Sequence, residues 1–324
     1  MIKITPLASE SLGIRSLAVF VETPDIKILL DAGASLAPRF GKLPHPLEYR
    51  ELKEARERIK KFAQKADLIT ITHYHFDHYT QTWDTVEPKF TWSSYHEAEQ
   101  IYASKQVCAK HIEKMINYSQ RKRGYVFSKV AKKFTDKIEY IDAANLEFGS
   151  TKVQFSKPLP HGEDGTPLGY VLALTIRHDD DTALFGSDIQ GPISDQCMQY
   201  ILKQKPTVMI VSGPPTYLAG TKVNGIAIEN GIKNLFALTK TIKHIIVDHH
   251  LLRDLNSMNI VNELKQHAEK YGHKVSTFAE YLGQKNNLLE AMREELYQRY
   301  PPDQEFEKWT RLVQQRQTDE LPPL

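Results

Sequence analysis

The stretch THYHFDHYT (residues 72–80) holds three histidines and an aspartate within six positions, directly after the apolar run LITIT. Residues two apart in an extended chain point to the same side, so His73 and His75 can offer both imidazoles to one cation. Asp77 and His78 follow one short turn later and can face a second cation. The spacing therefore predicts a cluster of metal ligands just after a strand.

The residue types in this cluster also indicate what kind of metal site it forms. Imidazole and carboxylate groups together suit zinc, iron or manganese, and no cysteine stands among them to favour a closed structural site. The alternative is that these are ordinary histidines of a surface loop, but that explanation leaves the regular spacing H-x-H-x-D-H without a reason. We therefore expect an open, reactive site.

The elements that must position this cluster alternate between short strands and amphipathic helices. A charged helix is expected at 46–67, and helices and strands take turns beyond residue 190. The strands expected before residue 190 lie at 16–23, 26–33, 68–72, 151–156, 168–177 and 182–188. This order predicts an α/β (α+β) protein whose sheets are covered by helices.

Composition limits the class of protein. The chain has 324 residues, 41% of them hydrophobic and 25% charged, with a formal charge of +2, all ordinary values for a globular enzyme. Cys108 and Cys197 lie far apart, which indicates buried reduced thiols rather than a disulfide framework. No secretory leader and no apolar run of about eighteen residues is visible, so we expect a cytoplasmic protein without a membrane partner.

A basic segment follows the histidine cluster. Residues 95–137 are predicted to form a basic helical insert, and between Lys105 and Lys137 ten basic residues face only two acidic ones, Glu113 and Asp136. Tyrosines such as Tyr118 and Tyr125 are interleaved with these charges. Two interpretations stay open for 105–137: a lid that gathers the phosphate groups of a substrate, or a solvated helix surface.

The histidine pattern resembles a known signature. Residues 73 to 78 are similar to the H-x-H-x-D-H motif of the metallo-β-lactamase-fold hydrolases. The resemblance implies a four-layer αββα sandwich with a dinuclear metal site at the sheet edge, covering about residues 1–283 as one hydrolase domain. Residues 284–324 are then a C-terminal helical extension, broken at Pro301 and Pro302, that provides packing or a surface for a homo-oligomer.

The same resemblance implies further metal ligands downstream. His161 lies in a loop before a strand, as the third motif of the family does, and Asp188 resembles the carboxylate that bridges both metals. His249 resembles the last ligand, and the adjacent His250 is its rival. Asp31 resembles the carboxylate of the first motif, which braces the histidine loop from behind the ligands.

These residues together imply a reaction. Two divalent cations, Zn²⁺ in the first place with Fe or Mn as alternatives, would be bridged by Asp188 and a hydroxide that attacks the substrate. Asp77 would orient the nucleophile or shuttle its proton, and His250, if it is not a ligand, would contact the substrate oxyanion or the leaving group.

Two further stretches, ESLGIRS and DHHLLRD, resemble a group of archaeal-type cytoplasmic metallo-hydrolases to which the resemblance assigns no substrate. Arg15 in the first stretch either contacts substrate or forms a structural salt bridge. Arg253 and Asp254 in the second are expected to cap the following helix. Tyr217, after a strand, either lines the pocket or packs in an ordinary turn.

We therefore expect a hydrolase of a small, anionic ester, with phosphoesters and phosphodiesters favoured over lactones and thioesters because of the basic segment. The first alternative is a nuclease that acts on RNA or single-stranded DNA. The second is a protein that keeps a di-metal site for redox chemistry or sensing without hydrolysis. No flavin-binding stretch supports this last alternative.

Overall fold

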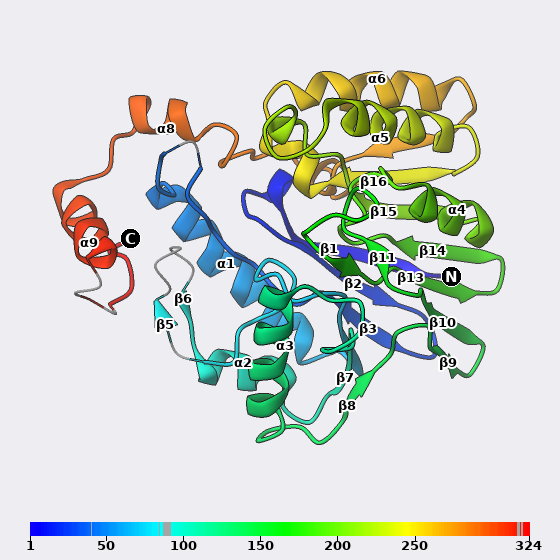
Figure 1. Ribbon diagram of the computed structural model, residues 1–324, viewed down its shortest axis with the longest axis horizontal. Helices are drawn as coiled ribbons and strands as arrows, with labels where there is room; N and C mark the ends of the chain where they lie inside the picture. The colour runs from blue at the N-terminus through cyan, green and yellow to red at the C-terminus, as the bar shows by residue number, and fades with distance from the viewer. Residues whose placement is uncertain (40, 84, 87–91, 316–317, 319) are drawn as a thin grey trace.

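Two β-sheets form the centre of the fold, and helices cover the outer face of each (Figure 1). The computed structural model describes residues 1–39, 41–83, 85–86, 92–315, 318 and 320–324. The layers therefore follow the order helix, sheet, sheet, helix. None of the helices in these ranges is long and apolar enough to cross a membrane.

The first sheet has the strand order β1-β2-β3-β4-β7-β8, antiparallel from β1 to β3 and parallel from β3 to β8. Its strands are β1 (Lys3–Ser9), β2 (Leu17–Glu22), β3 (Lys27–Leu30), β4 (Leu68–Ile71), β7 (Gln106–Ala109) and β8 (Ile138–Tyr140). All four residues of β4 are buried, as expected of a central strand with both faces covered.

The second sheet has the order β17-β16-β15-β14-β13-β10-β9, parallel from β17 to β14 and antiparallel beyond. Its strands are β9 (Asn145–Phe148), β10 (Thr151–Phe155), β13 (Leu174–His178), β14 (Asp181–Phe185), β15 (Val208–Ser212), β16 (His244–Asp248) and β17 (Lys274–Ser276). The described residues also form two short antiparallel pairs, β5 (Thr85–Val86) with β6 (Trp92–Ser93) and β11 (Leu159–Pro160) with β12 (Tyr170–Val171).

The helices fall into two layers and a C-terminal group. On the first sheet lie α1 (Pro46–Ala63), α2 (Tyr95–Tyr102) and α3 (Tyr118–Ala131), and on the second α4 (Asp195–Gln204), α5 (Gly225–Leu238) and α6 (Ser257–Glu269). Short turns and the C-terminal helices are η1 (Glu10–Leu12), η2 (Thr216–Leu218), η3 (His249–Arg253), α7 (Phe278–Tyr281), α8 (Arg293–Arg299) and α9 (Gln304–Gln314). Local sequence starts α1: His45 and Glu48 form a capping box, and Pro46 occupies the first turn.

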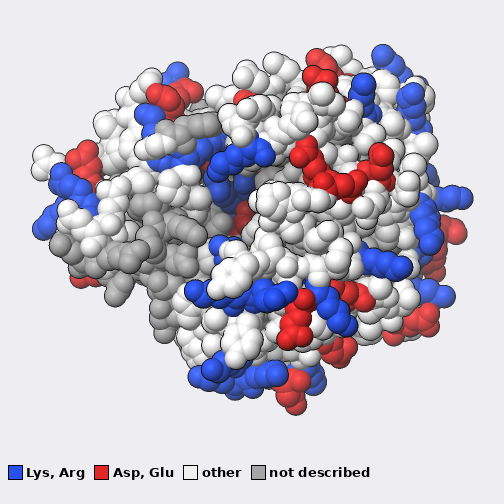
Figure 2. Space-filling model, in the orientation of Figure 1, with Lys and Arg blue, Asp and Glu red and all other residues white. Residues whose placement is uncertain are grey.

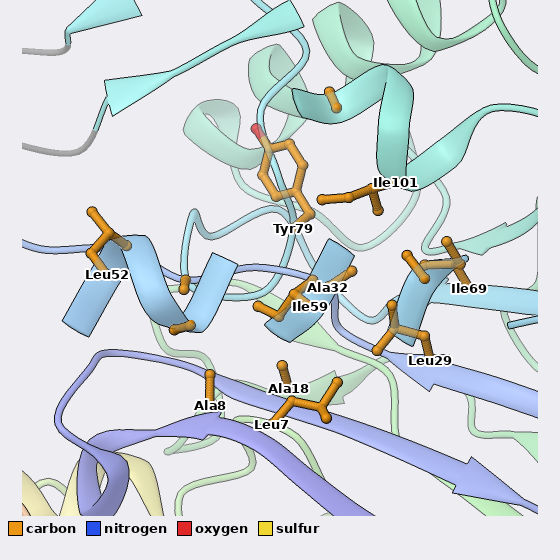
Figure 3. Close-up of a cluster of buried hydrophobic side chains, with 14 of the residues drawn as sticks. Leu7, Ala8, Ala18, Leu29, Ala32, Leu52, Ile59, Ile69, Tyr79 and Ile101 are labelled. Carbon is orange, nitrogen blue, oxygen red and sulfur yellow. The ribbon is translucent and has the colours of Figure 1, made fainter. Parts of the chain in front are cut away.

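Three apolar layers hold these elements together. One lies between the sheets and includes Val19, Val21 and Leu30 of the first sheet and Val153, Leu174 and Ile176 of the second. A second joins the first sheet to α1 to α3, where Leu52 and Ile59 of α1 meet Leu7 and Ala18 of the strands (Figure 3). The third lies between the second sheet and α4 to α6. Burial of apolar surface on both faces of each sheet is what stabilises the sandwich.

The basic segment 95–137 differs from the expected helical insert in one respect. It contains α2 and α3, but between them runs β7, whose residues Val107, Cys108 and Ala109 are buried and paired in parallel with β4. The segment is therefore more than the basic helical insert that was expected, because it also supplies a strand of the first sheet. A short apolar run of four residues does not distinguish a buried strand from a helix.

The C-terminal helices pack against the body of the protein. Phe306 and Trp309 of α9 lie edge-on to the buried ring of Tyr49, at centroid distances of 5.6 and 5.4 Å. Arg293 of α8 forms a two-pronged, buried ion pair with Glu48 of α1. The predicted interruption at Pro301 and Pro302 falls between α8 and α9.

Candidate metal-binding site

Four strands of the two sheets end near one another and deliver most of the candidate ligands. The 72–78 loop follows β4, Asp31 follows β3, Asp188 comes shortly after β14, and His249 directly follows β16. All four strands belong to the parallel parts of their sheets. Ligands of open α/β sheets bind beyond the carboxyl ends of such strands, so this is the edge where a site is expected.

The first donor group combines His73, His75, His161 and Asp188. Asp188 Oδ2 lies 3.4 Å from His73 Nε2 and 3.1 Å from His161 Nε2. His73 Nε2 and His75 Nδ1 are 3.0 Å apart. Four atoms placed tetrahedrally at 2.0 to 2.1 Å from a zinc ion are about 3.3 to 3.4 Å from one another. The spacing of this group therefore fits a single cation.

The second donor group combines Asp77, His78 and His249, and Asp188 also reaches it. His78 Nε2 lies 3.4 Å from His249 Nε2, which lies 3.6 Å from Asp77 Oδ2. Asp188 places Oδ2 3.1 Å from His78 Nε2 and Oδ1 3.4 Å from His249 Nε2. Asp188 thus stands between the two groups, with oxygens available to both.

Unsatisfied polar atoms mark the same place. Among the residues that the structure describes, His161 Nε2 and both carboxylate oxygens of Asp188 are buried without a hydrogen-bond partner. Buried polar atoms normally have partners, and leaving one unpaired costs about 1–3 kcal/mol. A cation at each donor group would satisfy these atoms, so the residues present fit the metal ions that the fold implies.

Two carboxylates bind the Nδ1 atoms of His78 and His249, the ring nitrogens that point away from the second donor group. Asp31 Oδ2 lies 2.8 Å from His78 Nδ1, and Glu10 Oε2 lies 2.7 Å from His249 Nδ1. Asp31 also accepts hydrogen bonds from the backbone N–H and the hydroxyl of Thr72, at 2.8 and 2.5 Å. Such outer carboxylates orient the imidazole and raise its basicity toward a metal.

His249 and His250 take different positions. Both Nε2 atoms approach Asp188, at 3.4 and 3.6 Å, and the two rings stack at a centroid distance of 4.4 Å. Only His249 also belongs to the group with Asp77 and His78. Within the described part of the chain, Nδ1 of His250 is buried without a hydrogen-bond partner. The geometry therefore favours His249 as the ligand.

Burial and neighbouring charges set the protonation of the cluster. Burial lowers the pKa of His73 to about 4, and repulsion from His78 adds to this effect. Burial opposes ionisation of Asp188, but the charge of His78 and of its other histidine neighbours outweighs it and holds the pKa well below the usual value. Burial alone would lower the pKa of His249, but the negative charges of Glu10 and Asp188 together outweigh burial and raise the pKa to about 9. A metal ion bound at His249 would therefore displace a proton from its imidazole.

The backbone around the cluster is unusually strained. Asp31, Ser187 and His249 are buried non-glycine residues with φ values of 50°, 51° and 58°. Left-handed backbone is costly for residues with a Cβ and is found most often at functional sites. Gly33 leaves room for the histidine loop, since a Cβ there would lie 2.2 Å from the backbone nitrogen of Tyr79.

Arg253 connects the second donor group to a neighbouring pocket. Its Nε donates to Glu10 at 2.6 Å, and its Nη atoms reach Asp77 Oδ2 and the hydroxyl of Tyr217, both at 3.2 Å. Tyr217 and Arg253 line a cavity of about 420 Å³, where the guanidinium of Arg39 lies 4.1 Å from the centroid of the Tyr217 ring. The metal-binding cluster thus borders a concave surface.

Comparison with known proteins identifies the family. A UPF0282 protein of Methanopyrus kandleri is 40% identical over 295 residues, which span 91% of this chain and 98% of the relative. The chain belongs to the UPF0282 family. A UPF0282 protein of Methanocaldococcus jannaschii is 41% identical over 91% of this chain and 97% of its own length. The resemblance to an archaeal group is thus confirmed, and no protein-family model matches the chain.

The fold of the UPF0282 chain is similar to that of a solved structure. Tm1679, a metal-dependent hydrolase of the β-lactamase superfamily, aligns with a TM-score of 0.50 over 86% of this chain and 96% of its own, at 12% sequence identity. The prediction of a metallo-β-lactamase fold is therefore confirmed.

Within this UPF0282 member, the structure gathers every residue that the sequence singled out for the cluster. The residues are His73, His75, Asp77, His78, His161, Asp188, His249 and His250, with Asp31 behind them. Arg15 forms an ion pair with Glu290, and Tyr217 lines the pocket. Arg253 was expected to cap a helix but points into the site instead, because Glu10 and Asp77 attract its guanidinium.

Glu10 and Asp248 escaped the reasoning from sequence. Asp248 is buried and accepts hydrogen bonds from the backbone of Ser11, His249 and Phe278, which pins the end of β16 to η1 and α7. Asp248 directly precedes His249 and His250, and this position in the sequence could have indicated its role. Glu10 lies 239 residues from His249, and no local pattern connects the two.

Proposed function

We propose that the chain is a hydrolase that holds two divalent metal ions and acts on a small phosphoester or phosphodiester. The observation that carries this proposal is the position of Asp188 between two donor groups whose ligand atoms have the spacing of a metal site. A serine or cysteine nucleophile is not needed in such a site. The buried thiols of Cys108 and Cys197, whose pKa burial raises to about 12, play no part in it.

Metal ions bound at these groups would supply Lewis-acid activation of a water molecule and of the bond to be hydrolysed. The chain's own residues position the reacting groups. Asp77, held by Arg253, has a carboxylate oxygen at the edge of the second group and is placed to accept a proton from the attacking water. His250, 8% exposed at its side chain, is placed to donate to the leaving group.

Zinc is the metal that we propose for both groups. Their ligands are imidazole nitrogens and carboxylate oxygens, which zinc accepts in open catalytic sites, with iron and manganese as competitors. Metal analysis of the purified protein by mass spectrometry decides between these metals and gives the number of ions per chain.

The adjoining pocket supports an anionic substrate. Its lining brings Arg39, Lys42 and Arg253 to the side of the second donor group, next to the ring of Tyr217. Guanidinium groups suit the paired oxygens of phosphate. Glu290 lines the same pocket but is already shared by Arg15 and Arg39.

The test is turnover of bis-p-nitrophenyl phosphate against a panel of lactones and thioesters, with the metal-loaded wild type and with Asp77→Asn. We expect hydrolysis of the phosphodiester by the wild type and a loss of about 100-fold or more in Asp77→Asn. A wild type that carries its full metal content and hydrolyses none of these compounds, nor any member of a metabolite mixture, would contradict the proposal.

A further inference from the structure

One face of α3 combines positive charge with exposed aromatic rings. The helix carries Arg121, Lys122, Arg123 and Lys129 and no acidic residue. Tyr118 and Tyr125 are 82% and 57% exposed. Residues three, four and seven apart share a helix face, so both tyrosines lie on one strip with Arg121, Lys122 and Lys129. Figure 2 shows the blue atoms of Lys and Arg on the part of the surface where Figure 1 draws α3.

The residues of this strip lie outside the packed side of α3. The buried side of α3 packs through residues such as Phe127 and Ala131, and the exposed tyrosines contribute little apolar burial to it. Cations in the first half of a helix lie near the positive end of the helix dipole and repel one another. Arg121 donates from Nη2 to the carbonyl of Glu113 at 3.3 Å. A bound anion would relieve this repulsion.

The first turn of α3 also touches the metal-binding cluster. Nε2 of Gln120 lies 3.4 Å from Nε2 of His75 and donates to the carbonyl of Leu168 at 2.8 Å. Asn117, which caps the helix, donates to the same carbonyl at 2.8 Å. On the other side, the guanidinium of Arg123 lies 4.1 Å from the ring centroid of Phe76, within the histidine loop. The N-terminal end of α3 therefore lies at the rim of the cluster, with Gln120 and Arg123 on the inner side of the helix and the strip on its outer, exposed side.

We propose that this face of α3 binds single-stranded nucleic acid and leads a phosphodiester of the strand to the metal-binding cluster. Cations that follow a backbone, with aromatic rings on which unpaired bases stack, are the means by which proteins hold single strands. Paired bases are not free to stack on Tyr118 and Tyr125, so the surface selects single strands over duplexes.

The reaction rests on the proposed metal-dependent hydrolysis of a phosphodiester, with a single-stranded nucleic acid in place of the small ester. One water is consumed: its oxygen forms a bond to phosphorus, and the bond from phosphorus to one sugar oxygen breaks. The released sugar oxygen takes up a proton and becomes a hydroxyl. The other product keeps the phosphate as a monoester, so no oxidant or second substrate is required.

Binding is tested without hydrolysis, by fluorescence anisotropy of labelled oligouridylate and oligothymidylate in EDTA, with a labelled duplex of the same length for comparison. Arg121→Ser with Lys122→Ser should weaken single-strand binding about tenfold or more and reduce the salt dependence by about 1.4 in the slope of log K against log salt. Tyr118→Ala with Tyr125→Ala should weaken binding by about tenfold or more without changing that slope.

The matched control is Lys240→Ser with Lys243→Ser, which removes the same charge from exposed positions between α5 and β16. An equal loss of affinity in this control, equal binding of the duplex, or no binding by the wild type at low salt overturns the proposal. Turnover of bis-p-nitrophenyl phosphate without oligonucleotide binding overturns only the role of α3. Oligonucleotide binding by a metal-loaded protein that hydrolyses nothing overturns only the proposed hydrolase function.

Discussion

Asp188 is the residue on which both donor groups depend, since its two oxygens approach His78, His161 and His249. We predict that Asp188→Asn weakens metal binding by about 100-fold or more, because an amide replaces the negative charge that both groups share. Metal content after dialysis, measured by mass spectrometry, checks this, with circular dichroism to show that the variant is folded. Asp180→Asn, an exposed aspartate in a turn, is the matched control.

One result would contradict the prediction for Asp188. If Asp188→Asn keeps both ions at the wild-type level after dialysis, the carboxylate does not bridge the two groups.

Arg253 holds Glu10 and Asp77 at once, and a lysine cannot make both contacts with the same geometry. We expect Arg253→Lys to lower kcat/KM for bis-p-nitrophenyl phosphate about 10- to 100-fold, the usual effect of losing a group that orients ligands. Arg311→Lys, an exposed arginine of α9, should change nothing. Wild-type kinetics of Arg253→Lys would show that the guanidinium only supports the fold.

The sequence predicted residues of this site to different degrees. Spacing alone was enough to predict four of them, because one loop holds them all: His73, His75, Asp77 and His78. Arg253 follows His249 by four residues in the turn η3, and the sequence does not show which way its guanidinium points. Glu10 reaches His249 only through the packing of η1 against η3.

At the scale of elements, the loop after β3 and the histidine loop pack together at Gly33. A Cβ there would lie 2.2 Å from the backbone nitrogen of Tyr79, and backbone cannot move aside as a flexible side chain does. We predict that Gly33→Ala lowers the free energy of unfolding by about 3 kcal/mol. Gly225→Ala, where an added Cβ meets nothing within 4 Å, is the control in urea denaturation. Equal midpoints for the two variants would contradict this account.

The elements themselves were predictable where their pattern is long or their context strong. The amphipathic helix near 46–67 and the apolar run of β4 appear in the structure close to their expected bounds, as α1 and β4. β7 was missed, because four residues between charged segments carry no periodicity of their own and owe their conformation to pairing with β4 and β8.

At the scale of the whole molecule, Glu290 ties the C-terminal segment to the body through Arg15 and Arg39. Burial alone would raise the pKa of Glu290, but the charge of Arg15 and its neighbours outweighs burial and lowers the pKa well below its usual value. The folded carboxylate is therefore harder to protonate than the unfolded one. Its stabilising effect is complete above the unfolded pKa of about 4.3 and is lost as the pH falls below that value.

We therefore predict that Glu290→Gln lowers the free energy of unfolding by about 3 kcal/mol at pH 7, and that the difference from wild type shrinks below pH 4. Urea denaturation across this pH range, in buffer with a chelator, measures it. Glu294→Gln is the control, since Glu294 is 71% exposed at its side chain. A difference that stays constant as the pH falls would show that Glu290 acts through packing alone.

The ligands of the cluster come from distant parts of the chain, with the 73–78 loop on the first sheet and Asp188 and His249 on the second. During synthesis, His249 leaves the ribosome long after the first sheet has been made. Neither donor group can be completed by the first sheet alone, so a metal ion that needs all of these residues can bind only after the second sheet has been made. Metal occupancy would then separate mature molecules from those in which the two sheets have not yet joined.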